Sequence, residues 1–126
     1  MAQNISSLNL AFIGDAVYEL FVREHELRGF NGDVNTLNKK TTKLSKAVTQ
    51  SEIVDIVLPI LSDEEEAVYK RGRNAKSASV PKSCTPAQYR KATGLESLIG
   101  HLYLNGQLDR VKEILEYGIK QYQKDK

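Results

Sequence analysis

Residues 10–20 of the chain read LAFIGDAVYEL, and residues 94–104 read GLESLIGHLYL. Each stretch is an apolar, helix-like run that contains a carboxylate, Asp15 or Glu96, with a glycine nearby. A carboxylate among large apolar side chains is costly to desolvate and seldom stays buried without a partner. The two stretches therefore suggest two helices that cross, so that Asp15 and Glu96 share one cation.

The glycines favour a close crossing of these two helices. Gly14 lies inside the helical pattern, where glycine costs about 1 kcal/mol relative to alanine. Its presence there indicates that another group packs closely against the backbone. Gly94, Ser97 and Gly100 give the second helix a smooth face of small residues. We expect the two helices to pack tightly through these positions.

The rest of the chain predicts an all-α fold. No segment alternates apolar and polar residues for long enough to indicate a strand. Six helices are predicted, over approximately residues 7–28, 33–41, 45–59, 62–71, 85–105 and 107–122. Residues 72–84 are predicted to form a loop because they are rich in Gly, Ser, Asn and Pro. We predict one compact all-α domain that spans residues 1–126.

Several helix boundaries have recognisable capping residues. The segment 62–65 (SDEE) and the segment 85–88 (TPAQ) both fit the capping-box pattern. Asp33 and Ser45 are expected to cap the second and third helices, and Pro59 is expected to bend or end the third. The four acids at 63–66 suit the positive end of a helix, so we do not interpret them as a metal cluster.

Composition indicates a soluble intracellular protein. The chain has 126 residues, of which 40% are hydrophobic, and its single cysteine, Cys84, excludes an internal disulfide. That cysteine usage favours a reducing cytoplasm. The longest apolar stretch, residues 56–61, is far shorter than the roughly 20 residues that span a bilayer.

The formal charge of +2 hides a strongly basic segment at residues 70–91. This segment has no acidic residue and contains seven basic ones: Lys70, Arg71, Arg73, Lys76, Lys82, Arg90 and Lys91. The other 11 basic residues are outnumbered by 16 acidic ones. A local basic block on an acidic body is typical of a polyanion-binding surface. A merely solvated basic face is the alternative, and the sequence leaves both open.

The spacing of charges alone does not assign a role to Asp15 and Glu96. Neither acid has a basic residue three or four positions away, so a local helical ion pair is excluded. A distant lysine could still pair with either acid, which leaves a metal site and an ordinary ion pair balanced. His25 and His101 lack the spacing of zinc ligands, and no local pattern supports a Cys84–His nucleophile.

Both acid-bearing stretches resemble the catalytic domain of the ribonuclease III family. Residues 12–20 (FIGDAVYEL) are similar to its signature helix, and residues 93–104 (TGLESLIGHLYL) are similar to its second acidic motif. The intervening residues 70–76 (KRGRNAK) and 80–82 (VPK) look like the short Mini-ribonuclease III subfamily. The resemblance runs along nearly the whole chain.

The resemblance implies that Asp15 and Glu96 are catalytic metal ligands. It implies Mg²⁺ as the cofactor and hydrolysis that leaves a 5′-phosphate and a 3′-hydroxyl. The full-length enzymes carry further acids, where this chain has Leu8, Ala11 and Thr93. Two carboxylates can suffice for Mg²⁺, which keeps several waters and also binds substrate phosphates. With so few ligands, we expect weak metal binding in the absence of RNA.

The resemblance also implies the substrate. It suggests cleavage of double-stranded RNA in the maturation of the large-subunit (23S) ribosomal RNA precursor, and it leaves open whether a ribosomal protein assists. Duplex RNA is gripped mostly through phosphates and 2′-hydroxyls. The strongest candidates for these contacts are Arg71, Arg73, Lys76 and Lys82, followed by Lys70, Arg90 and Lys91. The chain has no room for a separate double-stranded-RNA-binding domain, so the catalytic domain itself would hold the RNA.

The family cuts both strands as a two-fold homodimer, and the same is expected here. The first helix carries Phe12 in addition to an inward set made of Leu10, Ile13, Val17, Leu20, Phe21 and Leu27. Such an apolar excess fits a contact between two copies of the chain. One alternative is a non-catalytic RNA-binding module on the same fold. Another is a helical adaptor protein, which would leave the basic segment unexplained.

Overall fold

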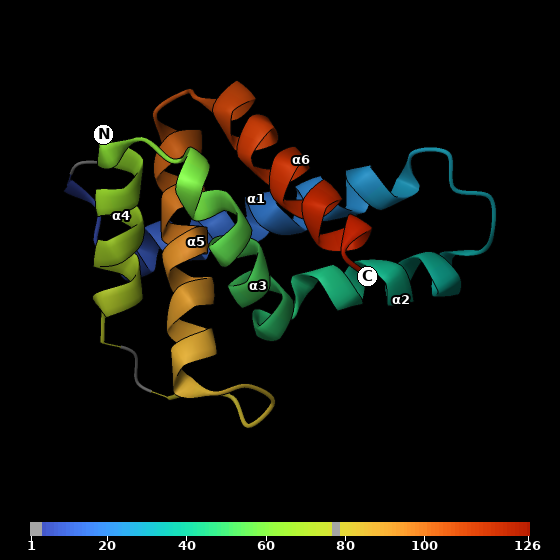
Figure 1. The fold of residues 1–126 in the computed structure, drawn as a ribbon, viewed down its shortest axis with the longest axis horizontal. Coiled ribbons are helices and arrows are strands. Elements are labelled where there is room, and N and C mark those ends of the chain that lie inside the picture. The colour runs from blue at the N-terminus through green and yellow to red at the C-terminus, as the bar shows by residue number, and fades with distance from the viewer. Residues whose placement is uncertain (1–3, 77–78) are drawn as a thin grey trace.

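The computed structural model describes residues 4–76 and 79–126, and these residues fold into helices (Figure 1). Within this part of the chain there are six α-helices and no strand, which confirms the all-α prediction. The elements are α1 (Ser7–Leu27), α2 (Val34–Ser45), α3 (Ala47–Val57), the 3-10 helix η2 (Leu58–Ile60), α4 (Asp63–Asn74), α5 (Pro86–Leu104) and α6 (Leu108–Lys124).

Helix α5 is the centre of the fold. It lies between α4 and α3 in Figure 1, with α1 crossing behind it, and it packs on all three. Its inward side chains are fully buried, among them Leu95, Leu98 and Ile99. Burying each of these is worth about 1.5–3 kcal/mol, which makes α5 the main source of core stability. Helix α2 extends away from this core and is the most exposed of the helices.

The crossing of α1 and α5 is a contact between two backbones. A Cβ atom placed on Gly14 would overlap the carbonyl oxygen of Glu96, and one placed on Gly100 would overlap the carbonyl oxygen of Leu10. Only glycine fits at these two positions. The predicted close crossing of the two helices is therefore confirmed.

Helix α4 packs against another face of α5 in a similar way. A Cβ atom on Gly72 would overlap the side chain of Ser97, and Gly94 lies against the ring of Tyr69. Ser97 Oγ also donates a hydrogen bond of 2.7 Å to the carbonyl oxygen of Ser7 on α1. Because Gly72 is buried in this contact, α4 continues to Asn74, three residues beyond the predicted end.

Three of the four predicted N-terminal capping residues are confirmed. Both capping boxes are present, Ser62 with Glu65 and Thr85 with Gln88, and Asp33 caps α2. The fourth prediction is wrong, because Ser45 is the last residue of α2 rather than the cap of α3. A contact with α1 explains this difference, because the hydroxyl of Ser45 donates a hydrogen bond to Glu19.

Part of the apolar face of α1 points away from the core. Leu20 and Leu27 were expected to face inward, but they are 68% and 58% exposed, and Phe12 is 82% exposed. The first turn of α2 adds Val34, which is 74% exposed. Exposed apolar residues grouped in this way are typical of an interaction surface.

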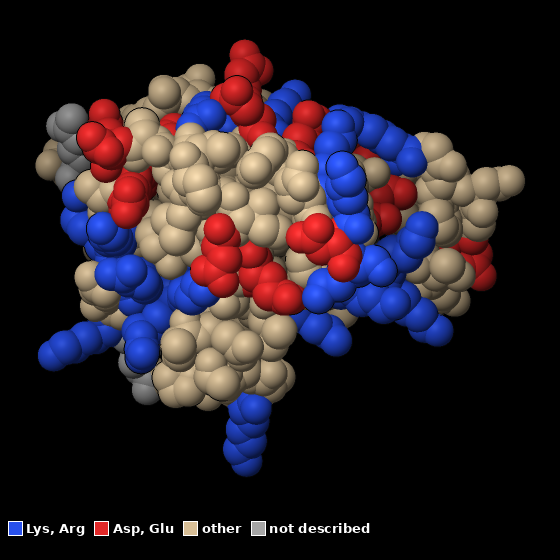
Figure 2. All heavy atoms as spheres, viewed as in Figure 1, with Lys and Arg blue, Asp and Glu red and all other residues tan. Residues whose placement is uncertain are grey.

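Charged side chains lie in separate groups on the surface. Figure 2 shows basic groups over the end of α4 and over α2, with acidic side chains between them over α3. In the described part of the chain, no helix is both long enough and apolar enough to cross a membrane.

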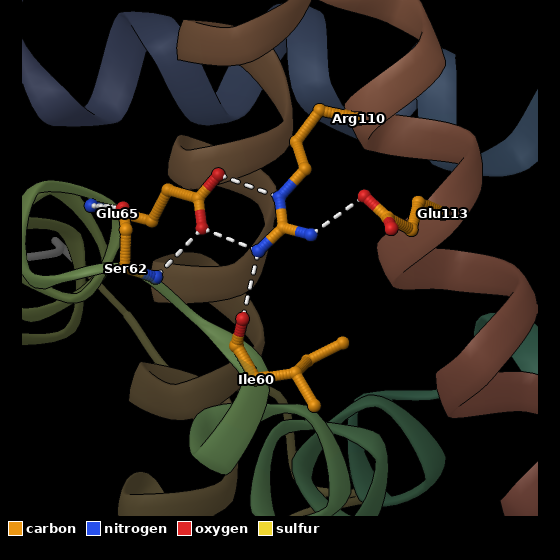
Figure 3. A network of polar contacts seen from close by, with 5 residues as sticks. All are labelled: Ile60, Ser62, Glu65, Arg110 and Glu113. Carbon is orange, nitrogen blue, oxygen red and sulfur yellow. Dashed lines mark hydrogen bonds and ion pairs between the residues drawn. The ribbon is translucent and has the colours of Figure 1, made fainter.

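A polar network anchored by Arg110 connects three elements (Figure 3). Its guanidinium donates two hydrogen bonds of 2.8 Å to the carboxylate of Glu65 at the start of α4. It also donates to the carbonyl oxygen of Ile60 in η2 (2.8 Å) and to Glu113 on α6 (2.7 Å). The two hydrogen bonds from Arg110 to Glu65 lower the pKa of Glu65, and a hydrogen bond from the backbone nitrogen of Ser62 adds to this effect. The network fixes η2 and α4 against α6.

We expect Arg110→Ala to destabilise the fold by about 3 kcal/mol, because it leaves the Glu65 carboxylate buried without its partner. Urea unfolding at pH 7 measures this loss. The pKa of Glu65 is lowered in the folded state, so this contribution should fade as the pH falls below the ordinary carboxyl range. Glu113→Ala is the matched control, because that side chain is exposed and should matter little. Equal effects of the two substitutions would contradict this view of the network.

Candidate active site and nucleic-acid interface

The crossing of α1 and α5 places the carboxylates of Asp15 and Glu96 side by side. Asp15 follows Gly14, which lies against the carbonyl group of Glu96. The pKa of Glu96 is raised to about 8, first of all by burial, then by the hydrogen bond that its protonated form donates to Asp15 and by the negative charge of Asp15. Asp15 is exposed to solvent while Glu96 is mostly buried, so the pair opens outward on one side.

Gln50 on α3 is the third member of this site. Its Nε2 atom donates a hydrogen bond of 3.3 Å to Glu96 Oε2, and its side chain is only 3% exposed. This hydrogen bond favours the charged form of Glu96 and holds its carboxylate in place. Gln50 was not among the residues predicted from the sequence; the available signal was a polar residue on the apolar side of the third predicted helix.

No basic side chain neutralises the pair in the part of the chain that the structure describes. The ion pairs formed there involve neither Asp15 nor Glu96. An ordinary tertiary ion pair was the main alternative to a metal site. Two adjacent carboxylates without a described cationic partner are instead the donor set that a hard cation takes.

The positions at which the larger enzymes carry additional acids contribute no metal ligand. Leu8 is partly exposed, Ala11 is buried, and Thr93 is buried with its hydroxyl donating to the carbonyl oxygen of Tyr89 (3.0 Å). Among residues 4–76 and 79–126, no group of three or more His, Cys, Asp or Glu side chains could hold a metal. Two carboxylates suit Mg²⁺, which retains waters, better than Zn²⁺, which takes three or four protein ligands.

The end of α2 is fixed beside this site by two hydrogen bonds to α1. The hydroxyl of Tyr18 donates to the carbonyl oxygen of Leu44 (2.5 Å), and the hydroxyl of Ser45 donates to Glu19 Oε2 (2.6 Å). Burial and the nearby Glu96 raise the pKa of Tyr18, so its hydroxyl stays protonated and continues to donate. The second bond occupies the Ser45 side chain, which explains why this residue does not cap α3.

The seven basic residues predicted to contact RNA lie around the end of α4, the following loop and the start of α5. Figure 2 shows a basic group over this part of the fold. Lys91 is already paired with Asp55 at 2.6 Å, and Lys70 is paired with Glu66 at 3.1 Å. Arg73 lies over the ring of Tyr69, with its guanidinium carbon 5.8 Å from the ring centroid. The other four are exposed and form no ion pair within the described residues: Arg71, Lys76, Lys82 and Arg90. We call these four the basic loop set.

Comparison with known proteins identifies the family. The model of the Ribonuclease III domain matches residues 8–107. A Mini-ribonuclease 3 of Thermoanaerobacter sp. (strain X514) is 46% identical over 93% of this chain and 82% of its own length. A Mini-ribonuclease 3 of Enterococcus faecalis (strain ATCC 700802 / V583) is 38% identical over 94% of this chain and 91% of its own. The chain belongs to the Mini-ribonuclease III branch of the ribonuclease III family.

A solved structure agrees with this family assignment. The crystal structure of a protein from Fusobacterium nucleatum matches 94% of this chain and 94% of its own, with a TM-score of 0.83 at 37% identity. As a Mini-ribonuclease III, the chain is an endoribonuclease that acts on RNA. The resemblance seen in the sequence is thereby confirmed, and the two acid-bearing motifs both lie within residues 8–107.

We expect Glu96→Gln to stabilise the metal-free protein at pH 9, by about 1 kcal/mol or more, because it removes a buried negative charge. The pKa of Glu96 is raised to about 8, so the wild type loses stability as the pH rises from the ordinary carboxyl range through 8. The gain should therefore shrink at pH 5, where Glu96 is protonated. Thermal unfolding of both proteins across this pH range, with EDTA present, measures the difference. A gain that is independent of pH would contradict the assignment.

Proposed function

We propose that this Mini-ribonuclease III is a Mg²⁺-dependent enzyme that cleaves double-stranded RNA, with Asp15 and Glu96 as its metal ligands. One observation carries the proposal: two carboxylates from different helices meet at a site open to solvent, with no described basic residue beside them. The family is generally dependent on divalent metals, which supports the same choice of cofactor.

Each residue of the site has a separate task in this proposal. Asp15 presents its carboxylate to solvent, where a hydrated ion and a phosphate can approach. Gln50 orients Glu96 through its amide hydrogen bond. Glu96 must lose its proton to bind a cation, so metal affinity should rise between pH 7 and pH 9. When bound, Mg²⁺ supplies a more acidic water and polarises the scissile phosphate.

The hydrolysis joins one water oxygen to the phosphorus and breaks the bond from phosphorus to the 3′-oxygen. The departing oxygen takes up a proton, which leaves a 3′-hydroxyl on one fragment and a 5′-phosphate on the other. This outcome follows from the resemblance to the family, and the exposed position of Asp15 is compatible with it. The proposed natural substrate is the precursor of 23S ribosomal RNA in the cytoplasm, with or without the help of a ribosomal protein.

The basic loop set supports recognition of an RNA duplex. Duplex RNA offers phosphates and 2′-hydroxyls rather than readable base edges, so exposed lysines and arginines without acidic partners are the side chains it requires. Arg71, Lys76, Lys82 and Arg90 meet that condition, whereas Lys91 and Lys70 would first have to leave Asp55 and Glu66. We therefore propose the basic loop set as the principal phosphate contacts on this side of the site.

A homodimer is the proposed working form, because a single site cuts a single strand. The apolar surface on α1 supports it: Phe12 projects from the helix, and a hollow nearby is lined by Ile13, Leu20, Tyr103 and Leu108. In a two-fold contact the same patch serves both copies, so a projection and a hollow on one surface can fit each other. The exposed Leu27 and Val34 extend this surface toward α2.

The test of the proposed reaction is cleavage of a long RNA duplex with Mg²⁺. We expect Asp15→Asn and Glu96→Gln each to abolish cleavage while leaving duplex binding intact, because both replacements keep the side-chain volume and remove a metal-binding charge. Gel analysis of the products and a filter-binding assay give the two readouts. Asp109→Asn is the control, since this acid lies at the start of α6. Full cleavage by either site variant would overturn the assignment of Asp15 and Glu96.

The test of the dimer is Phe12→Glu. A charge in the centre of an apolar interface should separate the two copies without affecting the core, because Phe12 is 82% exposed. Sedimentation equilibrium should then give a dimer for the wild type and a monomer for the variant. Thermal unfolding of the variant checks that each chain remains folded. A wild-type protein that sediments as a monomer at assay concentration would contradict the proposal.

A further inference from the structure

The chain contains a second basic segment without acidic residues, at residues 34–51. It has four lysines, Lys39, Lys40, Lys43 and Lys46, and all four are exposed. The segment lies on α2 and the first turn of α3, well away from the basic loop set on α4 and α5. Figure 2 shows the two basic groups apart on the face in view, with the acidic residues of α3 between them.

Three of these lysines form a row. Lys39 and Lys43 are four residues apart on α2 and so lie on one face, about 6 Å apart along the helix axis. Lys46 follows three residues later, at the junction with α3. The opposite face of α2 is the buried one, with Thr41 and Leu44. We call Lys39, Lys43 and Lys46 the α2 lysine row.

The α2 lysine row is not neutralised within the described part of the protein. None of its three members forms an ion pair there. By contrast, Lys40 lies to one side of the row, 4.0 Å from Glu26 and over the ring of Phe30. Like charges one turn apart on a helix repel one another, so the row costs stability unless a polyanion binds it.

The end of the row is connected to the carboxylate pair through Gln50. The carbonyl oxygen of Lys46 accepts a hydrogen bond of 2.9 Å from the backbone nitrogen of Gln50. The side chain of Gln50 in turn donates to Glu96. Because the bonds from Tyr18 and Ser45 fix the last turn of α2 on α1, the row has a defined position relative to the site.

We propose that the α2 lysine row is a second binding surface for duplex RNA, which holds phosphates on the side of the carboxylate pair away from the basic loop set. The inference rests on the proposed function and adds a contact surface to it. A surface that recognises a duplex by shape must touch its phosphates at more than one place. Two basic surfaces on different parts of the fold provide this arrangement. The basic loop set ends on α5, which also carries Glu96, and the α2 lysine row ends four residues before Gln50, which contacts Glu96.

The experiment measures binding of an RNA duplex longer than about 16 base pairs, across a series of salt concentrations. The Asp15→Asn background prevents cleavage under the proposed function. Three double variants carry the same loss of charge: Lys39→Gln with Lys43→Gln, Arg71→Gln with Lys76→Gln, and, as the control, Lys120→Gln with Lys124→Gln on α6. All six side chains are exposed, and thermal unfolding checks that each variant is folded.

We expect the slope of log affinity against log salt to become shallower by about two per subunit in the α2 variant and in the loop variant, which is about four in the proposed homodimer, and to stay unchanged in the control. Lys39→Arg with Lys43→Arg should restore the slope. An α2 variant that behaves like the control, while the loop variant loses slope, overturns this inference and leaves the proposed function standing. An equal loss in the control also overturns it, because the effect is then one of net charge. A parent protein that binds no duplex overturns the proposed function itself.

Discussion

The close contact between the backbones of α1 and α5, which two glycines permit, is the constraint on which the rest of the structure depends. Gly14 and Gly100 leave each helix in contact with the backbone of the other, and any Cβ atom at either position would separate them. The separation would carry Asp15 away from Glu96. The same crossing also brings Ser97 of α5 within hydrogen-bond distance of the carbonyl oxygen of Ser7 on α1. The candidate site is therefore a consequence of backbone packing rather than of a flexible loop.

This arrangement reduces stability at the site, and other parts of the fold compensate. A mostly buried carboxylate beside a second one is unfavourable, as the raised pKa of Glu96 indicates. The two capping boxes and the Arg110 network supply stability at places away from the site. Local destabilisation of this kind is common where a protein keeps groups for chemistry rather than for packing.

The sequence predicted the features that depend on nearby residues or on backbone shape. The caps at Ser62 and Thr85 are local, and the glycine pattern was enough to foresee the meeting of Asp15 and Glu96. Features set by distant contacts could not be foreseen. Gln50 reaches Glu96 across 46 positions of the chain, and the exposure of Leu20 depends on where α1 leaves the core. The number of charges in residues 70–91 likewise could not reveal that Lys91 forms an ion pair with Asp55.

The charge layout of the protein follows from the chemistry proposed for it. A site made of two carboxylates repels the phosphates of its own substrate, so affinity for RNA has to come from surfaces outside it. The basic loop set and the α2 lysine row lie in different segments of the chain, and both are joined to the site through short runs of chain. A phosphate held by these surfaces would also bring oxygens to the cation, since Mg²⁺ accepts substrate oxygens readily. On this argument, RNA itself supplies the ligands for which this chain has Leu8, Ala11 and Thr93, and metal binding and RNA binding should strengthen each other.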